Sequence, residues 1–288
     1  MNVSQSLRAA TERLSATSDT ARLDAELLMA HALGCTRTEL LLRHMQSEVP
    51  AAFDALVERR AGHEPVAYIT GSAEFYGLEL IVGPAVLIPR GDTETLVEVA
   101  REAFADRQPP RRILDLGTGS GALLLAALSL WPDAEGVAIE RSPEALAVAR
   151  ANGRRHAPAA RFLSGDWTQP GWASDLGQFE LILSNPPYVE DEADLTPSVR
   201  AHEPAQALFS GPDGLDDYRL LVPQIPALLA ENGISIIEIG WTQGQAVSAL
   251  ARASHMSARV HHDLAGRERA VEMARIANIP LGKGRSAH

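Results

Sequence analysis

From residue 111 onward, short apolar segments alternate with longer segments of helical pattern. Most of the apolar segments lack a polar face, which is typical of strands that are buried on both faces. The alternation therefore predicts an α/β domain with a mostly parallel sheet and helices on both of its faces. The predicted helices cover residues 120–131, 143–154, 215–229 and 244–253, with Pro223 and Pro226 interrupting the third. The seven predicted strands cover residues 113–116, 136–140, 162–163, 179–184, 234–239, 259–262 and 270–274.

The residues before this region follow other patterns. Leu7, Ala10 and Leu14 lie at helical spacing, and the chain up to about residue 65 predicts a set of helices. Residues 68–71 and 74–82 have strand character with turn glycines between them, which predicts a β-hairpin. We therefore divide the chain into a helical domain over residues 1–75, a hairpin linker over residues 76–88 and an α/β domain over residues 89–288.

The composition excludes several classes of protein. Lys+Arg total 26 and Asp+Glu total 37, so the formal net charge is −11, and no basic run indicates direct binding of nucleic acid. Lys283 is the only lysine, which excludes a P-loop or Schiff-base lysine from the body of the chain. The only cysteine, Cys35, excludes an intramolecular disulfide and a multi-cysteine metal site. The chain has neither a signal-peptide pattern nor an apolar run long enough to cross a membrane, so we expect a cytoplasmic protein with no membrane partner and no metal.

The turn after the first predicted strand is rich in glycine. Glycines let a ligand approach the backbone closely, and the start of the following helix leaves amide groups free. The third glycine comes one residue too early for the pyrophosphate-binding pattern of dinucleotide sites. A tight turn that binds no ligand is the alternative. The candidate cofactor-binding residues in this turn are Asp115, Gly117, Thr118, Gly119, Ser120 and Gly121.

Further candidate cofactor-binding residues follow the next two predicted strands. Glu140 ends the second strand, where a carboxylate of a doubly wound fold accepts hydrogen bonds from ribose hydroxyls. Asp166 and Trp167 follow the third strand, and a carboxylate beside an aromatic ring would bind adenine by hydrogen bonding and stacking. An exposed glutamate at a strand end and an aromatic side chain in a surface loop are the alternatives.

The most specific motif is Asn185-Pro186-Pro187-Tyr188, directly after the fourth predicted strand. The two prolines have no N–H and fix their φ angles, so the Pro186 carbonyl is free to face a ligand. The Asn185 amide oxygen is a second acceptor. Two acceptors held by a rigid turn match the two N–H bonds of an amino or amide group, and Tyr188 offers a flat face for a planar group.

Two charged residues are weaker candidates for substrate binding. Arg90 lies where a predicted extended segment meets a helix, and Glu203 lies in a loop that we expect at the same edge of the sheet. Each is equally compatible with a purely structural role.

Together these motifs resemble a known family of enzymes. The glycine-rich segment 114–121 with Glu140 is similar to the cofactor site of Rossmann-like class I S-adenosylmethionine methyltransferases, and segment 185–188 resembles the motif of amino-methyltransferases. Nearly the whole chain resembles the release factor glutamine methyltransferases, although that family usually has aspartate at the position of Glu140. Further segments that carry this resemblance are 68–71, 88–90, Glu203-Pro204, Ala207-Leu208, Asp213-Gly214, 238–240, Gln243-Gly244 and 263–267.

The resemblance implies an activity, a cofactor and a partner. The cofactor would be S-adenosylmethionine, and the substrate would be the glutamine of the Gly-Gly-Gln motif of peptide-chain release factors. The resemblance implies catalytic roles for Asn185, Pro186 and Tyr188, with Pro187, Arg90 and Glu203 as further substrate-binding residues. Residues 1–75 would bind the body of the release factor.

Other activities remain possible from the residues alone. The same chemistry would serve methylation of an adenine amino group in nucleic acid or of another protein glutamine. The acidic helical segment disfavours the nucleic-acid alternative. A cofactor-binding module without enzymatic activity is a third hypothesis, which the intact motif at 185–188 disfavours.

Overall fold

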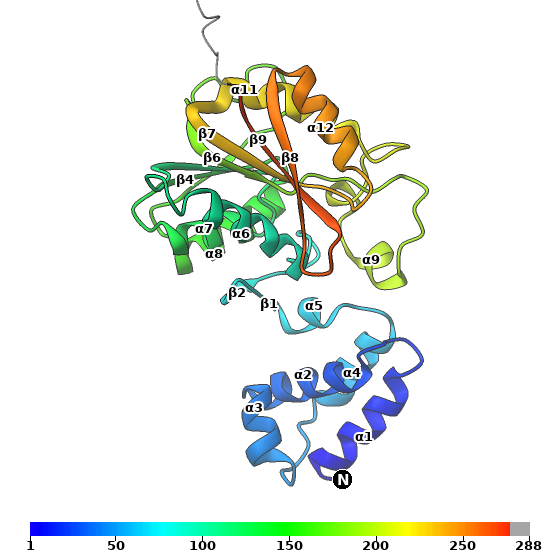
Figure 1. Cartoon of the computed structure of the whole chain (residues 1–288). Coiled ribbons are helices and arrows are strands. Elements are labelled where there is room, and N and C mark those ends of the chain that lie inside the picture. Colours follow the sequence, from blue (N-terminus) through cyan, green and yellow to red (C-terminus); the bar gives the residue numbers. More distant parts are fainter. Residues whose placement is uncertain (277–288) are drawn as a thin grey trace, which may run out of the picture.

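Seven strands form one sheet in the order β5-β4-β3-β6-β7-β9-β8 in the computed structural model, which describes residues 1–276. Neighbouring strands from β5 to β7 are parallel, and β9 runs antiparallel to both of its neighbours. The predicted α/β fold with a seven-stranded, mostly parallel sheet is therefore confirmed (Figure 1). The only lysine of the sequence, Lys283, lies outside the described residues. The strands are β3 Arg112–Leu116, β4 Glu135–Glu140, β5 Arg161–Ser164, β6 Phe179–Ser184, β7 Leu229–Glu238, β8 Met256–His262 and β9 Glu268–Arg275.

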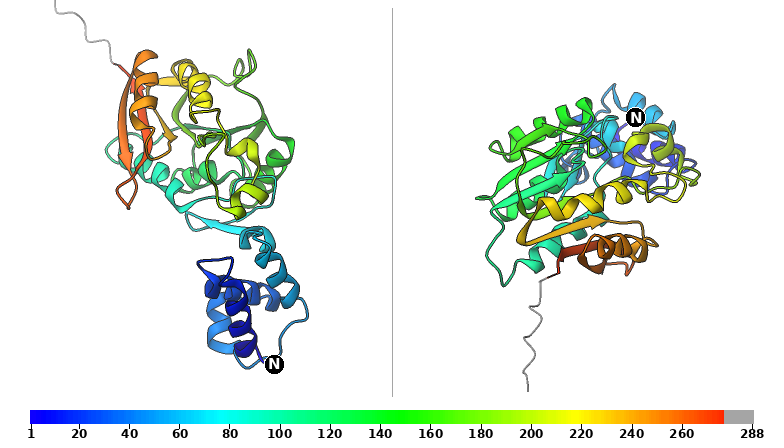
Figure 2. Two further views of the ribbon diagram at one scale, coloured as in Figure 1. Left: turned by 90° about the vertical axis from the view of Figure 1, so that its right-hand side faces the viewer. Right: turned by 90° about the horizontal axis from the view of Figure 1, so that it is seen from above.

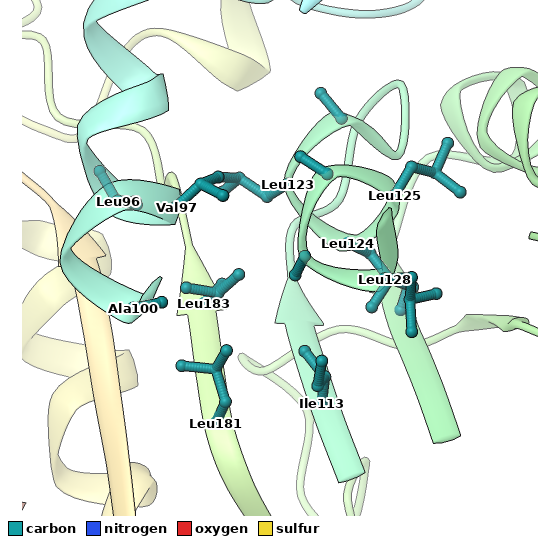
Figure 3. Packing of buried hydrophobic residues seen from close by; sticks show 14 of the residues in the cluster. Leu96, Val97, Ala100, Ile113, Leu123, Leu124, Leu125, Leu128, Leu181 and Leu183 are labelled. Carbon is teal, nitrogen blue, oxygen red and sulfur yellow. The ribbon is translucent and has the colours of Figure 1, made fainter. Parts of the chain in front are cut away.

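Helices cover both faces of the sheet because side chains alternate along each apolar strand. Ile113 packs against the helices of one face, whereas the next residue, Leu114, packs into the cluster on the other face. Figure 3 shows the first face, where side chains of α6 and α7 lie over Ile113 of β3 and over Leu181 and Leu183 of β6. The first face carries α6 Glu94–Ala103, α7 Ala122–Leu130 and α8 Pro143–His156, and the second carries α10 Asp216–Leu221, η4 Val222–Gln224, α11 Ile225–Leu228 and α12 Gly244–Ala253.

The first part of the chain folds into a separate set of helices with its own core. Leu7, Leu28, Met29 and Phe53 are among its fully buried side chains. The left view of Figure 2 shows these helices as a cluster below the sheet, with the hairpin between the two. The helices are α1 Val3–Leu14, α2 Ala21–Leu33, α3 Arg37–Glu39, η1 Leu40–His44, α4 Phe53–Ala61 and α5 Val66–Thr70.

The predicted hairpin is present, but its strands do not lie at the predicted positions. The strand predicted at residues 68–71 is wrong, because residues 68–70 belong to α5, which follows Pro65 and is capped by Gly71 with a φ of 78°. Pro65 and Gly71 are suitable residues for the two ends of a helix, and their effect overrides the strand propensity of Tyr-Ile-Thr. The single strand expected over residues 74–82 is also wrong, because a turn at Tyr76-Gly77 divides it. The hairpin consists of β1 Ser72–Phe75 and β2 Leu78–Ile81, and it begins before the expected linker of residues 76–88.

The remaining short elements lie near the carboxyl edge of the sheet. The segment after the hairpin, which includes Arg90, has no regular structure and leads into η2 Gly91–Thr93 at the start of α6. After β6 a long loop carries α9 Pro197–His202 and η3 Ala205–Ala207. No helix among residues 1–276 is long and apolar enough to cross a membrane.

Candidate active site

The carboxyl ends of the parallel strands open into a pocket. The pocket lies between the glycine-rich turn after β3, the end of β4 and two loops from outside the sheet. In parallel sheets this edge is where strand ends and helix starts converge, so ligands bind there. The residues that line the pocket include Ala85, Val86, Leu87, Pro89, Arg90, Thr93, Asp115, Gly117, Thr118, Gly119, Ser120, Glu140, Arg141, Trp167, Asn185, Pro187, Pro204, Gln206 and Ala207.

The glycine-rich turn presents bare backbone to the pocket. Gly119 has a φ of 55°, and a Cβ atom built there would meet no protein atom within 4 Å. Gly121 has a φ of 89°, and its Cβ would lie 3.3 Å from Leu125 and 3.4 Å from Phe162. The open space at Gly119 therefore belongs to the pocket, whereas Gly121 permits close packing between α7 and its neighbours.

Glu140 stabilises this turn and still faces the pocket. Its Oε2 accepts a hydrogen bond of 3.0 Å from the Gly119 amide, and its Oε1 accepts one of 2.9 Å from the Ser142 amide. Only 8% of the residue is exposed. A carboxylate oxygen can accept more than one hydrogen bond, so Glu140 keeps acceptor capacity for the hydroxyls of a ligand.

Asp115 is buried at the base of the pocket, with 1% of its surface exposed. Its Oδ2 accepts hydrogen bonds from the Thr118 hydroxyl at 2.5 Å and from the Leu124 amide at 3.3 Å, which caps the first turn of α7. Its Oδ1 has no hydrogen-bond partner within residues 1–276. Burial raises the pKa of Asp115 to about 7, and the nearby charge of Glu140 adds to the shift. This acceptor would be satisfied by a donor, preferably a cationic one.

Trp167 lies against the glycine-rich turn, whereas Asp166 does not line the pocket. A Cβ atom built on Gly117 would lie 3.0 Å from Cη2 of Trp167, so the indole ring requires glycine there. The Trp167 Nε1–H donates to Asp217 Oδ1 at 3.3 Å, which fixes the orientation of the ring. Asp166 accepts a hydrogen bond of 2.9 Å from the Thr168 amide. The predicted contact of Asp166 with adenine stays a prediction.

The Asn185–Tyr188 turn follows β6 directly, as expected, and borders the pocket. Asn185 and Pro187 line the pocket, whereas Pro186 is buried and Tyr188 turns toward the end of β7. The Asn185 Nδ2 lies 3.5 Å from the Thr93 hydroxyl oxygen.

Tyr188 is held at three points. Its hydroxyl donates to Glu238 Oε1 at 3.1 Å, its amide donates to the Leu208 carbonyl at 3.1 Å, and its carbonyl accepts from Gln243 Nε2 at 3.0 Å. Burial and the charge of Glu238 raise the pKa of Tyr188 well above its usual range, so this hydroxyl stays protonated. The turn is therefore rigid at its C-terminal end.

Arg90 and Glu203 bind each other. The Arg90 guanidinium donates to Glu203 Oε1, and Glu203 Oε2 accepts a 3.3 Å hydrogen bond from the Ile88 amide. Arg90 lines the pocket, and so do Pro204, Gln206 and Ala207 of the segment after Glu203. The expectation that either residue contacts substrate stays a prediction.

Three polar residues at the site are not assigned a role by any sequence motif. Glu238 ends β7 in the way that Glu140 ends β4, and this shared pattern could have drawn attention to it. Thr93 and Asp217 gave no local signal, because their contacts join segments that are distant in the sequence. In the described part of the chain, no group of three or more His, Cys, Asp or Glu side chains is placed to bind a metal.

Comparison with known proteins gives consistent matches along the chain. Residues 5–71 match the family described as PrmC N-terminal domain, and residues 92–207 match the Methyltransferase small domain. The chain is 43% identical over 272 residues to the release factor glutamine methyltransferase of Caulobacter vibrioides, covering 91% of this chain and 93% of that protein. It is 42% identical over 279 residues to the protein of the same name from Moorella thermoacetica, covering 93% and 97%. A solved structure from Alicyclobacillus acidocaldarius, titled protein-(glutamine-N5) methyltransferase (release factor-specific), is 30% identical with a TM-score of 0.41, covering 67% of this chain and 98% of that one.

Proposed function

Because the chain belongs to the release factor glutamine methyltransferase family, we propose that it methylates the side-chain amide nitrogen of a release factor glutamine. The glutamine is that of the Gly-Gly-Gln motif, and the methyl donor is S-adenosylmethionine. The observation that carries the proposal is the Asn185–Tyr188 turn, which borders the same pocket as the glycine-rich turn and Glu140. The substrate belongs to translation, so we place the protein in the cytoplasm.

The pocket residues suit S-adenosylmethionine. Glu140 would accept hydrogen bonds from the ribose hydroxyls, and the unpartnered Oδ1 of Asp115 would suit the ammonium group. The open space at Gly119 would admit the ligand close to the backbone, and Trp167 would contribute an apolar wall. When bound, S-adenosylmethionine supplies a methyl group on a positively charged sulfur.

Asn185 and Pro186 would activate the amide nitrogen of the substrate. This nitrogen is a poor nucleophile because its lone pair is delocalised into the carbonyl. Hydrogen bonds from its two N–H groups to Asn185 Oδ1 and the Pro186 carbonyl would orient it and favour the positive charge that develops during transfer. The amide nitrogen would take up the methyl group that the bound donor supplies, the donor would leave as a neutral thioether, and the methylated amide would lose a proton to water. No general base is required.

The separate helical domain would bind the body of the release factor. It has its own core and contributes no side chain to the pocket lining. Leu42 is 77% exposed on η1 of this domain, which makes it a candidate contact.

Replacing Asn185 with alanine tests the proposed mechanism. We expect methyl transfer to fall on the order of a hundredfold or more, because one preorganised acceptor is lost. Affinity for S-adenosylmethionine, measured by calorimetry, is expected to change much less. An Asn185→Ala variant that methylates a release factor at the normal rate would contradict the mechanism.

A further inference from the structure

Gln243 has no role in the proposed reaction, yet its side chain contacts the turn that carries the proposed substrate acceptors. It lies directly before α12. Its Nε2 donates to the Tyr188 carbonyl at 3.0 Å and to the Gly214 carbonyl at 3.2 Å. Its Oε1 accepts the Gly240 amide at 2.9 Å. One side-chain amide therefore joins the turn after β6, the loop before α10 and the turn after β7.

These partners leave the Gln243 amide a single orientation. A carbonyl oxygen only accepts hydrogen bonds, so the carbonyls of Tyr188 and Gly214 must face the NH₂ group. The backbone amide of Gly240 only donates, so it must face the side-chain oxygen. Both N–H groups of the Gln243 amide are used, which makes the contact with Tyr188 specific.

Two glycines allow Gln243 to reach its partners. A Cβ atom built on Gly240 would lie 2.8 Å from Gln243 Oε1. Gly214 has a φ of 68°, and a Cβ atom built there would collide with the Tyr188 carbonyl oxygen and lie 2.8 Å from Gln243 Nε2. A larger residue at either position would displace the Gln243 amide or the Tyr188 carbonyl.

The contact with Tyr188 matters because the turn has few other degrees of freedom. Pro186 and Pro187 fix their own φ angles. The first end of the turn continues from β6, which is paired with a strand on each side. At the other end, the Tyr188 amide donates to the Leu208 carbonyl at 3.1 Å, and Gln243 holds the Tyr188 carbonyl. Without Gln243, the peptide group after Tyr188 would lose its side-chain anchor, and the turn could shift.

We propose that Gln243 is a positioning residue that acts through the Tyr188 carbonyl to keep the acceptors of the Asn185–Tyr188 turn in place for the substrate amide. The proposal rests on the proposed function for its catalytic consequence. Its structural part, the rigidity of the turn, applies to the free protein as well.

Gln224, at the end of η4, offers a matched control. Its Nε2 donates to the Trp167 carbonyl at 3.0 Å and to the Leu220 carbonyl at 2.7 Å, and its Oε1 accepts the Trp172 indole N–H at 2.6 Å. Like Gln243, it is half-buried. Replacing Gln224 therefore removes the same kinds of hydrogen bond without touching Tyr188.

Kinetics of three variants test the catalytic part of the proposal. Gln243→Leu removes the hydrogen bonds and should lower kcat by on the order of tenfold or more, because a small displacement of the acceptors is costly. Gln243→Glu keeps the shape but directs a carboxylate oxygen at two carbonyls, and it should lower kcat at least as far. Both variants should bind S-adenosylmethionine with wild-type affinity in calorimetry. Gln224→Leu should keep a kcat close to that of wild type at saturating S-adenosylmethionine.

Hydrogen exchange in the free protein tests the structural part without activity. The exchange rate of the Tyr188 amide, followed by NMR, reports how often this end of the turn opens. Gln243→Leu should raise that rate by on the order of tenfold, whereas Gln224→Leu should leave it unchanged. Amides in the middle of β4 should exchange alike in all variants, which checks that the fold is intact.

Two results would overturn the proposal: a wild-type kcat in both Gln243 variants, or unchanged exchange of the Tyr188 amide in Gln243→Leu. An equal loss of kcat in Gln224→Leu would also overturn it, because the effect would then not depend on contact with Tyr188. An inactive wild type that shows the expected exchange pattern would instead contradict the proposed function and leave the role of Gln243 in the turn supported.

Discussion

The Arg90 guanidinium, which lines the pocket, is paired with the Glu203 carboxylate. The two side chains differ in exposure, with 41% for Arg90 and 1% for Glu203. The pair joins the segment before α6 to the loop after α9, and both segments contribute residues to the pocket wall. This contact therefore helps to define the pocket shape before any ligand binds.

Replacing Arg90 alone should destabilise the protein more than replacing both Arg90 and Glu203. Arg90→Ala leaves the buried Glu203 carboxylate without its cation, and we expect a loss of about 1–2 kcal/mol in unfolding free energy. Adding Glu203→Gln to that variant removes the buried charge and should recover part of the loss. Urea unfolding of the two single variants and the double variant measures this coupling. A double variant less stable than Arg90→Ala would show that the pair is not the reason for the loss.

Gly119→Ala should weaken cofactor binding without an unusual loss of stability. Gly119 and Gly34 both have positive φ, 55° and 64°, and a Cβ atom at either would meet no protein atom within 4 Å. Alanine at either position should therefore cost about 1–2 kcal/mol of stability. Only Gly119 lines the pocket, so only Gly119→Ala should weaken S-adenosylmethionine binding, by about tenfold or more. Calorimetry on both variants checks this, and equal affinities would contradict the placement of the cofactor at Gly119.

Asp115 should lower the unfolding free energy of the ligand-free protein as pH rises. Its pKa is raised to about 7 in the folded protein and is about 4 in an unfolded chain. A raised folded pKa gives stability that is complete below the unfolded pKa and is lost as pH rises through the folded pKa. Asp115→Asn has no charge to bury, so relative to wild type it should gain on the order of 3 kcal/mol between about pH 4 and pH 8. The measurement is the difference in unfolding free energy between Asp115→Asn and wild type across that pH range. A difference that does not change with pH would contradict the raised pKa of Asp115.

Replacing Leu42 should raise KM for the whole release factor more than KM for a short peptide that contains the target sequence. If η1 contacts the body of the factor, Leu42→Ser should raise KM for the whole factor by about tenfold while KM for a short Gly-Gly-Gln peptide stays the same. Leu264, fully exposed between β8 and β9, offers a matched control as Leu264→Ser. Equal effects of Leu42→Ser on both substrates would argue against factor binding by the helical domain.

The sheet and its glycine-rich turn were predictable because their signals are local. Apolar runs such as that of β6 and the change from strand to helix after Asp115 are visible in the sequence itself. The error at residues 68–71 has the same origin, because Tyr-Ile-Thr has strand propensity and only its neighbours Pro65 and Gly71 favour a helix.

The contacts around the turn could not be predicted in this way. Thr93 and Asn185 come from separate segments and approach each other only in the folded chain, and Tyr188 reaches Glu238 because β6 pairs with β7. Apolar patterns predict that strands exist but do not give their order in the sheet. The pairing of Arg90 with Glu203 was invisible for the same reason, since 113 positions separate them.

The most direct test of the central claim is transfer of a radiolabelled methyl group from S-adenosylmethionine. The purified chain would be offered a release factor, the same factor with Gly-Gly-Ala in place of Gly-Gly-Gln, and duplex DNA. We predict label on the intact factor, on neither of the other two substrates, and on the glutamine when the factor is mapped by mass spectrometry. Label on the Gly-Gly-Ala factor or on DNA, or on none of the three, would contradict the account.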